Sequence, residues 1–498
     1  MEKTGSQLGS PPNIVVFVLD TARARNFSCY GHSTSTTNHI DDLAREGVLF
    51  ENAVSVSPWT LPSHASLFTG VPPSVHRTNA LERSLPNSLQ TLAETLSNAG
   101  YRTIGMSANP WFSSQFGITR GFDDFHHLFG PLATDSYREF VTHVTDDTKG
   151  LIDRFSNLVS DQSPIELFRN GTTAAYRQFI GREDDGASEA VDRSVDALKG
   201  SEPYFLFINF LEPHLPYEPP EAYLDRSVAE FGRSAVESVN QDAPAYNIRN
   251  ADMSSEDFEI LESLYDAELN YVDDCIGDIL DRIDQNGQRE NTFVAVLGDH
   301  GENIGDHRLM SHHYSANHTL LHIPMILRYP DIFEGGDVIK ERVSSLDLPT
   351  TFDSILRSAG VDTAGFQDQQ QGIPLHKDAP QDRSIVAEYL NPMPPIDQMR
   401  ERCDNPSFDV SVYDRTLRAI YRGQYKLIRG SDGTRQLYNI VDDPDEETDL
   451  IEQKPQIASE LESELTKAVE RYSDVSSVPS EATVTQDVEG RLEDLGYL

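Results

Sequence analysis

The chain has 498 residues, of which 38% are hydrophobic and 9% aromatic, so it is long enough for two domains and too apolar to be intrinsically disordered. Its 81 acidic residues outnumber 40 basic ones, and the formal net charge of -41 argues against nucleic acid and anionic membranes as partners. The three cysteines (Cys29, Cys275 and Cys403) have no metal-type spacing and make no disulfide framework, which fits a reducing compartment.

The acidic residues are spread along the whole chain rather than gathered in a tail, and only eight of the 40 basic residues are lysines. An acidic, lysine-poor surface is typical of proteins that stay soluble at high salt, because salt screens the repulsion between surface carboxylates. We therefore expect a salt-adapted, halophilic protein.

The N-terminal segment has no signal-like apolar region, and its first apolar run, residues 14–19, is far too short to span a bilayer. No later segment approaches the roughly 20 apolar residues that a spanning helix needs. The sequence therefore predicts a cytoplasmic protein with no membrane span.

In chain order, the first expected element is a strand at residues 13–19, NIVVFVL, whose continuous β-branched run is typical of a strand buried on both faces of a parallel sheet. Four further segments each combine a helix with an apolar strand, and they cover residues 40–56, 88–109, 187–214 and 269–300. One more strand is expected at residues 322–330. Helices that alternate with buried strands indicate an α/β fold, with a doubly wound, mixed and mostly parallel sheet flanked by helices.

The character of the sequence changes near residue 375, which predicts two domains. Residues 11–375 are expected to form the main α/β domain, with an insertion or lid at 126–186, where the chain is polar and irregular. Residues 376–475 are expected to form a smaller α+β domain, because short strand-like segments with glycine turns precede an amphipathic helix. Residues 476–498 are expected to be a tail that packs on the surface or is partly flexible.

Polar residues follow several of the expected strands: Asp20, Asn109, Glu212 with His214, and Asp299 with His300. Reactive groups in doubly wound folds lie at the carboxyl ends of the strands, so we expect these side chains to meet. Asp299 and His300 offer an oxygen and an imidazole nitrogen to one divalent ion, although either also suits a turn and Asp20 also suits a helix cap. Glu212 fits either a second metal site or, because prolines flank its loop, a structural role.

The segment SPWTLPSHASLFTG, residues 57–70, begins as a loop and then becomes helical, which places Thr60 at a helix N-terminus. Free backbone N–H groups and the helix dipole favour an anion there. A hydroxyl at this position that touches a metal ion is polarised towards the alkoxide and acts as a nucleophile. The alternative is that Thr60 or Ser63 only caps the helix.

Six segments, in this order, resemble the sulfatases, which belong to the wider alkaline-phosphatase-like superfamily. They are VLDTARARNFSCYG, PWTLPSHASLFTG, FLEPHLPYEPP, GDHGENIGDH, LLHIPMILRYP and QYKLIRGSDGTRQLYNIVDDPDEETDL. The resemblance extends from residue 13 to the end of the small domain. It implies an alkaline-phosphatase-like fold, with residues 11–375 as the catalytic domain of a hydrolase that acts on anionic esters.

The resemblance also implies a metal site and a nucleophile. Thr60 falls at the position that sulfatases convert to formylglycine, which makes it the implied nucleophile. Asp20, Asp299 and His300 fall on the family's metal-ligand positions. With Thr60 as a further ligand, they are expected to hold one divalent ion, which is Mn, Ca, Mg or Zn.

Histidines occupy the other positions where the resemblance implies contact with the substrate. His313 falls where the family usually has lysine, so His313 or His214 is expected to protonate the leaving oxygen. His64 replaces the family's arginine, which alters the contact of this position with the catalytic residue, and His64 is expected to bind the substrate. His312 is also expected to bind the substrate and is the alternative to His313. Asn109, from its place after a strand, is expected to hydrogen-bond a substrate oxygen, although such a residue also suits a turn. A second departure is Thr21, which stands where sulfatases usually have a second aspartate ligand.

Threonine at position 60 changes the expected chemistry. Oxidation of threonine gives a ketone rather than the formylglycine aldehyde, so an unmodified Thr60 would form a covalent ester that water must cleave. A phosphoenzyme is cleaved more readily than a sulfated alcohol, and this favours phosphate or phosphonate mono- and diesters slightly over sulfate esters. The alternatives are an arylsulfatase-like sulfuric ester hydrolase, a phosphoglycerol- or phosphoethanolamine-type transferase, and a non-catalytic anion-binding homologue. The expected substrate is a small-molecule or glycan anionic ester.

Overall fold

The computed structural model describes residues 11–128, 184–200, 202–377, 380, 382–473 and 486–495. At its centre is an eight-stranded sheet with the strand order β12-β2-β11-β7-β1-β6-β4-β5. Its strands are β1 (Asn13–Leu19), β2 (Val48–Phe50), β4 (Arg102–Ser107), β5 (Asp124–His127), β6 (Tyr204–Phe210), β7 (Thr292–Gly298), β11 (Met325–Arg328) and β12 (Asp337–Ile339). Only β11 runs antiparallel to its neighbours, β2 and β7, so the predicted mixed, mostly parallel sheet is confirmed.

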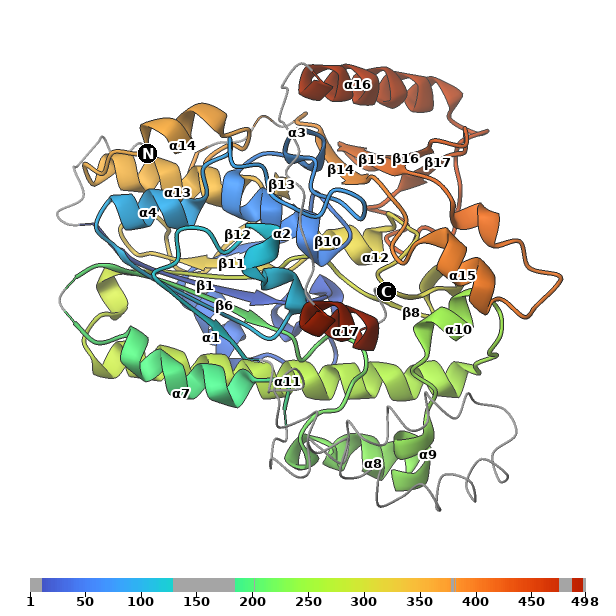
Figure 1. Cartoon of the computed structure of the whole chain (residues 1–498), viewed down its shortest axis with the longest axis horizontal. Coiled ribbons are helices and arrows are strands. Elements are labelled where there is room, and N and C mark those ends of the chain that lie inside the picture. The colour runs from blue at the N-terminus through green and yellow to red at the C-terminus, as the bar shows by residue number, and fades with distance from the viewer. Residues whose placement is uncertain are drawn as a thin grey trace.

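Helices cover both faces of this sheet, as Figure 1 shows. On one face lie α1 (Asn38–Glu46), α7 (Ala187–Ala197) and the long α11 (Ser255–Gln285), and on the other lie α2 (Thr60–Thr69), α4 (Leu92–Asn98) and α13 (Asp347–Ser358). Side chains of β1 alternate between the two cores, with Val15 and Phe17 facing α11 and Val16 and Val18 facing α2. This alternation explains why the strand sequence is apolar throughout.

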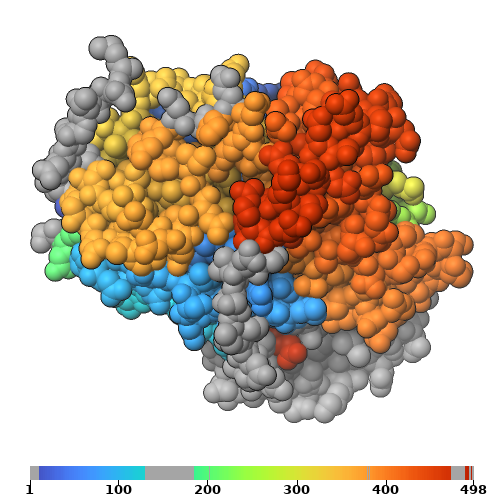
Figure 2. All heavy atoms as spheres, turned by 90° about the horizontal axis from the view of Figure 1, so that it is seen from above, coloured from blue at the N-terminus to red at the C-terminus, as the bar shows by residue number. Residues whose placement is uncertain are grey.

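The chain after the main sheet forms a second, antiparallel sheet with the order β14-β15-β16-β17. Its strands are β14 (Ile385–Tyr389), β15 (Leu417–Arg422), β16 (Tyr425–Gly430) and β17 (Arg435–Asn439). Helix α16 (Pro455–Ser473) covers this sheet by packing Leu461 and Leu465 onto Ile420 and Leu427. The predicted fold class, with its additional C-terminal antiparallel sheet, is therefore confirmed. Seen from above, these C-terminal segments form a continuous surface beside that of α13 (Figure 2).

Shorter elements complete the described part of the chain. Two small sheets contain β3 (Ala53–Val54), β10 (His322–Ile323) and β13 (Val343–Ser344), and β8 (Asn303–Ile304) with β9 (Met310–Ser311). The remaining α-helices are α3 (Pro73–His76), α8 (Asp225–Phe231), α9 (Arg233–Ser238), α10 (Ala243–Asn247), α12 (His318–Leu321), α14 (Ala364–Gln369), α15 (Ile396–Arg402) and α17 (Gln486–Asp494).

Two sequence predictions fall largely outside the described residues. Most of the insertion or lid expected at 126–186 lies there, apart from residues 126–128 and 184–186. Of the expected tail, residues 486–495 are described, and Val488 and Leu492 pack into the core on the α2 side of the sheet. The domain boundaries remain predictions.

Candidate active site

The carboxyl ends of β1 and β7 bring three of the predicted metal ligands together. Asp20 directly follows β1, and Asp299 and His300 directly follow β7, which pairs with β1 in parallel. One ligand atom from each of the three residues lies within 4.8 Å of the others, and all three side chains are buried. Parallel pairing therefore produces the cluster from residues almost 280 positions apart, because the two strands end at the same edge of the sheet.

The orientation of the His300 ring suits a metal ligand. Its Nδ1 lies 2.9 Å from the carbonyl oxygen of Gly301, so Nδ1 carries the proton and donates to that oxygen. Nε2 then presents its lone pair to Asp299 Oδ2 at 3.3 Å and Asp20 Oδ1 at 3.9 Å. A hydrogen bond that holds the far ring nitrogen is the usual support for a metal-binding histidine.

Each of the two aspartates has one side-chain oxygen without a hydrogen-bond partner in the part of the chain that the structure describes. Asp20 Oδ1 and Asp299 Oδ2 are buried and have no hydrogen-bond partner among the described residues. Burial raises the pKa of Asp20, and burial followed by the charge of Asp20 raises the pKa of Asp299 well above its ordinary value. Burial also lowers the pKa of His300 well below its ordinary value, so the imidazole is neutral. Two carboxylate oxygens and a neutral imidazole nitrogen that face one another fit a divalent ion.

Thr60 lies at this cluster as the first residue of α2. Its Oγ1 is 3.2 Å from His300 Nε2, and its hydroxyl is one of the groups that favour the charged form of Asp20 and so lower its pKa against the effect of burial. The N-cap residue of α2 is Trp59, which makes no side-chain cap, and Ser63 donates its hydroxyl to the Asp299 carbonyl oxygen at 2.8 Å. Neither Thr60 nor Ser63 therefore caps the helix, and the hydroxyl of Thr60 faces the proposed ligands instead.

Two asparagines hold the second oxygen of Asp20. Asp20 Oδ2 accepts hydrogen bonds from Asn109 Nδ2 at 2.8 Å and from Asn209 Nδ2 at 3.3 Å. Asn109 Oδ1 accepts a hydrogen bond from the Trp111 N–H at 3.0 Å. Both the nitrogen and the oxygen of the Asn109 amide are therefore hydrogen-bonded within the protein. A substrate contact for Asn109 remains a prediction. Asn209 was not predicted as a site residue, although it is the one polar side chain within the apolar strand YFLFINF apart from the hydroxyl of Tyr204.

His64 lies behind the ligands rather than on an open surface. Its Nδ1 is 3.0 Å from the Thr60 carbonyl oxygen and 3.5 Å from Asp299 Oδ2. The rings of Phe112 and Phe207 pack against it, with centroid distances of 4.7 and 6.0 Å. Burial lowers the pKa of His64 to about 4, so this residue supports Thr60 and Asp299 as a neutral group and does not supply the charge of the arginine it replaces. Its contact with the substrate stays a prediction.

The other three predicted histidines join His300 in one buried cluster. The His312 ring lies 4.5 Å from that of His300, 4.6 Å from that of His313 and 5.1 Å from that of His214, measured between centroids. Burial lowers the pKa of His313 to about 3 and that of His312 well below its ordinary value, so both are neutral. Neutral imidazoles beside the metal ligands can donate or accept hydrogen bonds without repelling a cation.

Two further residues fix this histidine cluster. Thr21, at the position of the missing aspartate, donates its hydroxyl to the Pro213 carbonyl oxygen at 2.6 Å and so anchors the loop that carries His214. Glu302 is fully buried, and its Oε1 lies 3.4 Å from His312 Nδ1. Glu302 was not predicted as a site residue, and its only signal in the sequence is its place two residues after His300.

Glu212 lies outside the cluster of proposed metal ligands. Its Oε1 accepts a hydrogen bond from the Ala187 N–H at 2.6 Å, at the first residue of α7. Burial, followed by the nearby charges of Asp184 and Asp185, raises the pKa of Glu212 to about 8. This contact is structural, and among the described residues Glu212 belongs to no group of three or more metal-ligating side chains.

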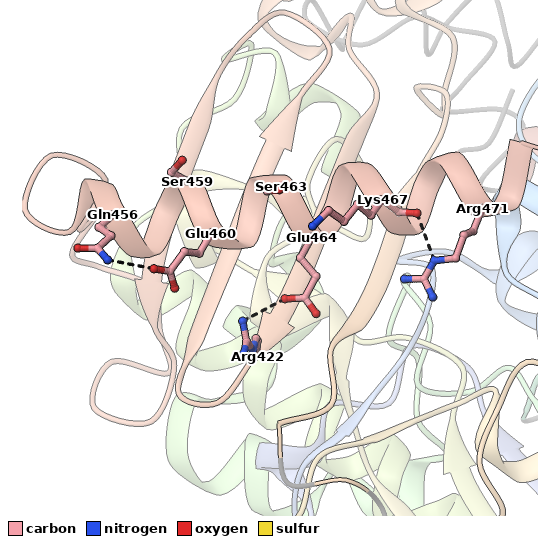
Figure 3. Close-up of a pocket in the computed structure, with 8 residues that line it drawn as sticks. All are labelled: Arg422, Gln456, Ser459, Glu460, Ser463, Glu464, Lys467 and Arg471. Atoms are coloured by element: carbon pink, nitrogen blue, oxygen red, sulfur yellow. Dashed lines mark hydrogen bonds and ion pairs between the residues drawn. The ribbon is translucent and has the colours of Figure 1, made fainter.

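A groove of about 820 Å³ lies on the C-terminal subdomain, away from these residues. Figure 3 shows it between the end of β15 and the polar face of α16, where Arg422 pairs with Glu464 at 3.2 Å. Its lining residues are Arg422, Gln456, Ser459, Glu460, Ser463, Glu464, Lys467 and Arg471. None of them is a predicted site residue.

No helix in the described ranges has the length and hydropathy to cross a lipid bilayer.

Comparison with known proteins gives a family match and several relatives. The sequence profile named Sulfatase matches residues 12–375. The chain is 25% identical over 483 residues to the ulvan-active sulfatase of Formosa agariphila, and the alignment covers 95% of this chain and 84% of that protein. It is 26% identical over 334 residues to the uncharacterized sulfatase YidJ of Escherichia coli, where the alignment covers 64% of this chain and 63% of YidJ. This second alignment therefore spans slightly less than two thirds of the length of YidJ.

Among solved structures, the phosphonate monoester hydrolase of Agrobacterium radiobacter has a similar fold. It superposes with a TM-score of 0.66 at 17% sequence identity, over 93% of this chain and 96% of that one. At this identity the likeness concerns the fold alone.

Proposed function

Because the chain belongs to the sulfatase family, a family of ester hydrolases, we propose that it is a metal-dependent hydrolase of sulfate esters with Thr60 as its nucleophile. The observation that carries the proposal is the meeting of Asp20, Asp299 and His300 with the hydroxyl of Thr60 in one buried cluster. The proposed substrates are small molecules or glycans that carry an anionic ester.

Asp20 Oδ1, Asp299 Oδ2 and His300 Nε2 are the proposed ligands of one divalent ion, with Thr60 Oγ1 beside them. When bound, the ion supplies positive charge that offsets the two carboxylates and the negative charge of the ester group. Asn109 and Asn209 keep Asp20 in place from the other side. The amides of Thr21 and His300 do the same for Asp299, at 3.1 and 2.8 Å from Oδ1.

Each of the remaining site residues has a separate role in the proposed reaction. Thr60 Oγ1 forms a bond to the sulfur of the ester while the bond from sulfur to the alcohol oxygen breaks. The histidine cluster takes up the proton that the Thr60 hydroxyl loses, and His214 or His313 donates a proton to the leaving oxygen, since both lie in the cluster beside His300 and His312. Water then cleaves the ester on Thr60, which releases the anion and restores the hydroxyl. The N-terminus of α2 favours the negative charge that the ester group brings to Thr60.

The comparisons support the sulfate ester alternative better than the phosphoester preference drawn from Thr60. The family match and the two relatives described above carry the name sulfatase. Phosphonate or phosphate esters are the second candidate, because the fold also resembles a phosphonate monoester hydrolase and because an unmodified threonine suits a phosphoenzyme.

A matched set of aryl esters tests the proposal. The set comprises a sulfate, a phosphate monoester, a phosphate diester and a phosphonate monoester of one phenol, each assayed with Mn, Mg, Ca or Zn at high salt. We expect the sulfate to have the highest kcat/KM. A higher value for the phosphonate or a phosphate would replace the first candidate by the second, and binding of metal without turnover of any ester would favour a transferase or a non-catalytic homologue. The mass of the peptide that contains Thr60 shows whether this residue is modified.

A further inference from the structure

A buried ion pair lies where the C-terminal sheet meets the main domain. Lys426 on β16 places its Nζ 2.7 Å from Oε1 of Glu446, in the loop that follows β17. Both side chains are fully buried, although lysine is rare in this chain and charged groups are unfavourable in the interior unless they are paired.

The second oxygen of Glu446 contacts the main domain. Oε2 accepts a hydrogen bond from the backbone N–H of His318 at 2.8 Å, at the first residue of α12. Glu446 has a φ of 55°, a left-handed conformation that is unfavourable for a residue with a side chain and that persists only where the surroundings impose it. The carboxylate is thus directed at α12 by its own backbone and by Lys426.

Helix α12 in turn holds the backbone beside the metal ligands. The Gly301 N–H donates to the Leu320 carbonyl oxygen at 2.8 Å, and Thr319 donates its hydroxyl to Asn303 Oδ1, also at 2.8 Å. A side chain at position 301 would collide with the Thr319 carbonyl oxygen, so α12 packs directly on this turn. The carbonyl of the same Gly301 accepts the Nδ1–H of His300, which fixes the direction of Nε2.

We propose that Glu446, held by Lys426, is a positioning residue for the metal ligand His300. The path runs from the carboxylate of Glu446 to the first amide of α12, from α12 to Gly301, and from Gly301 to the His300 ring. Loosening α12 frees the carbonyl that orients the ring, and loss of such a supporting hydrogen bond typically weakens metal binding by about 10- to 100-fold. The effect on metal binding rests on the proposed function, whereas the coupling of Glu446 to Gly301 is a property of the metal-free protein.

The experiment uses the full chain and three variants. Lys426→Met leaves the carboxylate buried without a counter-charge, so its bond to His318 is expected to weaken. Lys426→Met/Glu446→Gln removes both charges but keeps an oxygen that accepts from His318. Glu388→Gln is the matched control, because Glu388 is also buried and pairs with Arg418 at 2.8 Å, yet it reaches Ser74 on α3 rather than α12.

Two readouts separate the coupling from the metal site. In metal-free protein, hydrogen exchange should accelerate in the peptide that spans residues 299–321 for Lys426→Met, and stay near the parent rate for the double variant and the control. In calorimetric titration with Mn²⁺, Lys426→Met should bind about 10-fold more weakly, with the double variant within about threefold of the parent. If an aryl ester is turned over, kcat should fall with Mn²⁺ affinity while KM changes little.

Unchanged exchange in residues 299–321 for folded Lys426→Met would overturn the proposal, as would a lowered Tm with parent-like exchange and Mn²⁺ affinity. Accelerated exchange in a protein that binds no Mn²⁺ at all would retain the coupling and reject the proposed function instead. If Lys426→Met does not fold, Glu446→Asp takes its place. This variant keeps the counter-charge of Lys426, but its shorter side chain cannot reach both Nζ and the His318 amide. Faster hydrogen exchange in residues 299–321 and weaker Mn²⁺ binding are therefore expected from it as well.

Discussion

Two groups of aspartate and histidine in the described part of the chain have similar residue types but different hydrogen bonding. Asp20, Asp299 and His300 form one group, and His39, Asp273 and Asp274 form the other. Asp273 accepts the backbone N–H groups of His39 at 2.8 Å and Ile40 at 2.9 Å, so each of its oxygens holds the start of α1. In the first group one carboxyl oxygen of each aspartate, Asp20 Oδ1 and Asp299 Oδ2, has no hydrogen-bond partner among the described residues.

The difference shows how a structural carboxylate is distinguished from a ligand. Proximity of acidic groups and histidine is common to both sites, whereas an unsatisfied buried oxygen that faces a neutral imidazole is found only in the first. We infer that the α1 contact needs no cation and that the site at the ends of β1 and β7 does.

The largest expected effect comes from Thr60→Ala. Removal of the attacking oxygen should lower kcat by at least about 1,000-fold, while one metal ion still binds through the three remaining ligands. Steady-state kinetics beside calorimetric titration with Mn²⁺ measures both. Near-parental turnover would show that the site works without this hydroxyl.

A smaller effect is expected from Asn109→Ala. This variant removes the 2.8 Å hydrogen bond to Asp20 Oδ2 and leaves the longer one from Asn209, so Mn²⁺ affinity should fall by about 10-fold. A matched change at the α1 contact, His39→Ala, alters no proposed ligand and should leave the affinity unchanged. Equal losses in the two variants would remove the distinction between the sites.

The pH dependence of stability sharpens the account of Asp273. Burial raises the pKa of Asp273 to about 7, against the opposing effect of the amides of His39 and Ile40. A carboxyl whose pKa is raised on folding contributes stability below the pKa of the unfolded chain, near 3.8, and loses it as the pH rises through about 7. Urea unfolding at saturating Mn²⁺ should therefore show that the parent loses more stability between these pH values than Asp273→Asn does. Parallel pH profiles would contradict this.

Salt should have the smallest effect on the comparison, because Asp20, Asp299 and His300 are buried, as is Asp273 in the second group. If the surface is salt-adapted, raising KCl from about 0.1 M to about 3 M should raise Tm through screening of the surface carboxylates. The rise should be equal in the parent, Asn109→Ala and Asp273→Asn. A protein that is fully stable and active in dilute buffer would refute the halophilic interpretation.

The sequence predicted those contacts that follow from the alternation of helices and parallel strands. Apolar strands followed by Asp20, or by Asp299 with His300, predict a meeting of these residues, because parallel strands end at one edge. The sequence could not show that Thr21 binds Pro213 or that Asn209 turns from within a strand towards Asp20, since such contacts depend on how neighbouring strands are placed. The pairing of Lys426 with Glu446 likewise joins a strand to a loop 20 residues later and has no local pattern.

The central claim is that one cation binds at the ends of β1 and β7 and none at the α1 contact. Metal content of Asp299→Asn and Asp273→Asn, measured with the parent protein after equilibration with Mn²⁺, tests it most directly. We predict one bound ion in the parent and in Asp273→Asn, and none in Asp299→Asn. A folded Asp299→Asn protein that keeps its ion, or loss of the ion only in Asp273→Asn, would contradict the account.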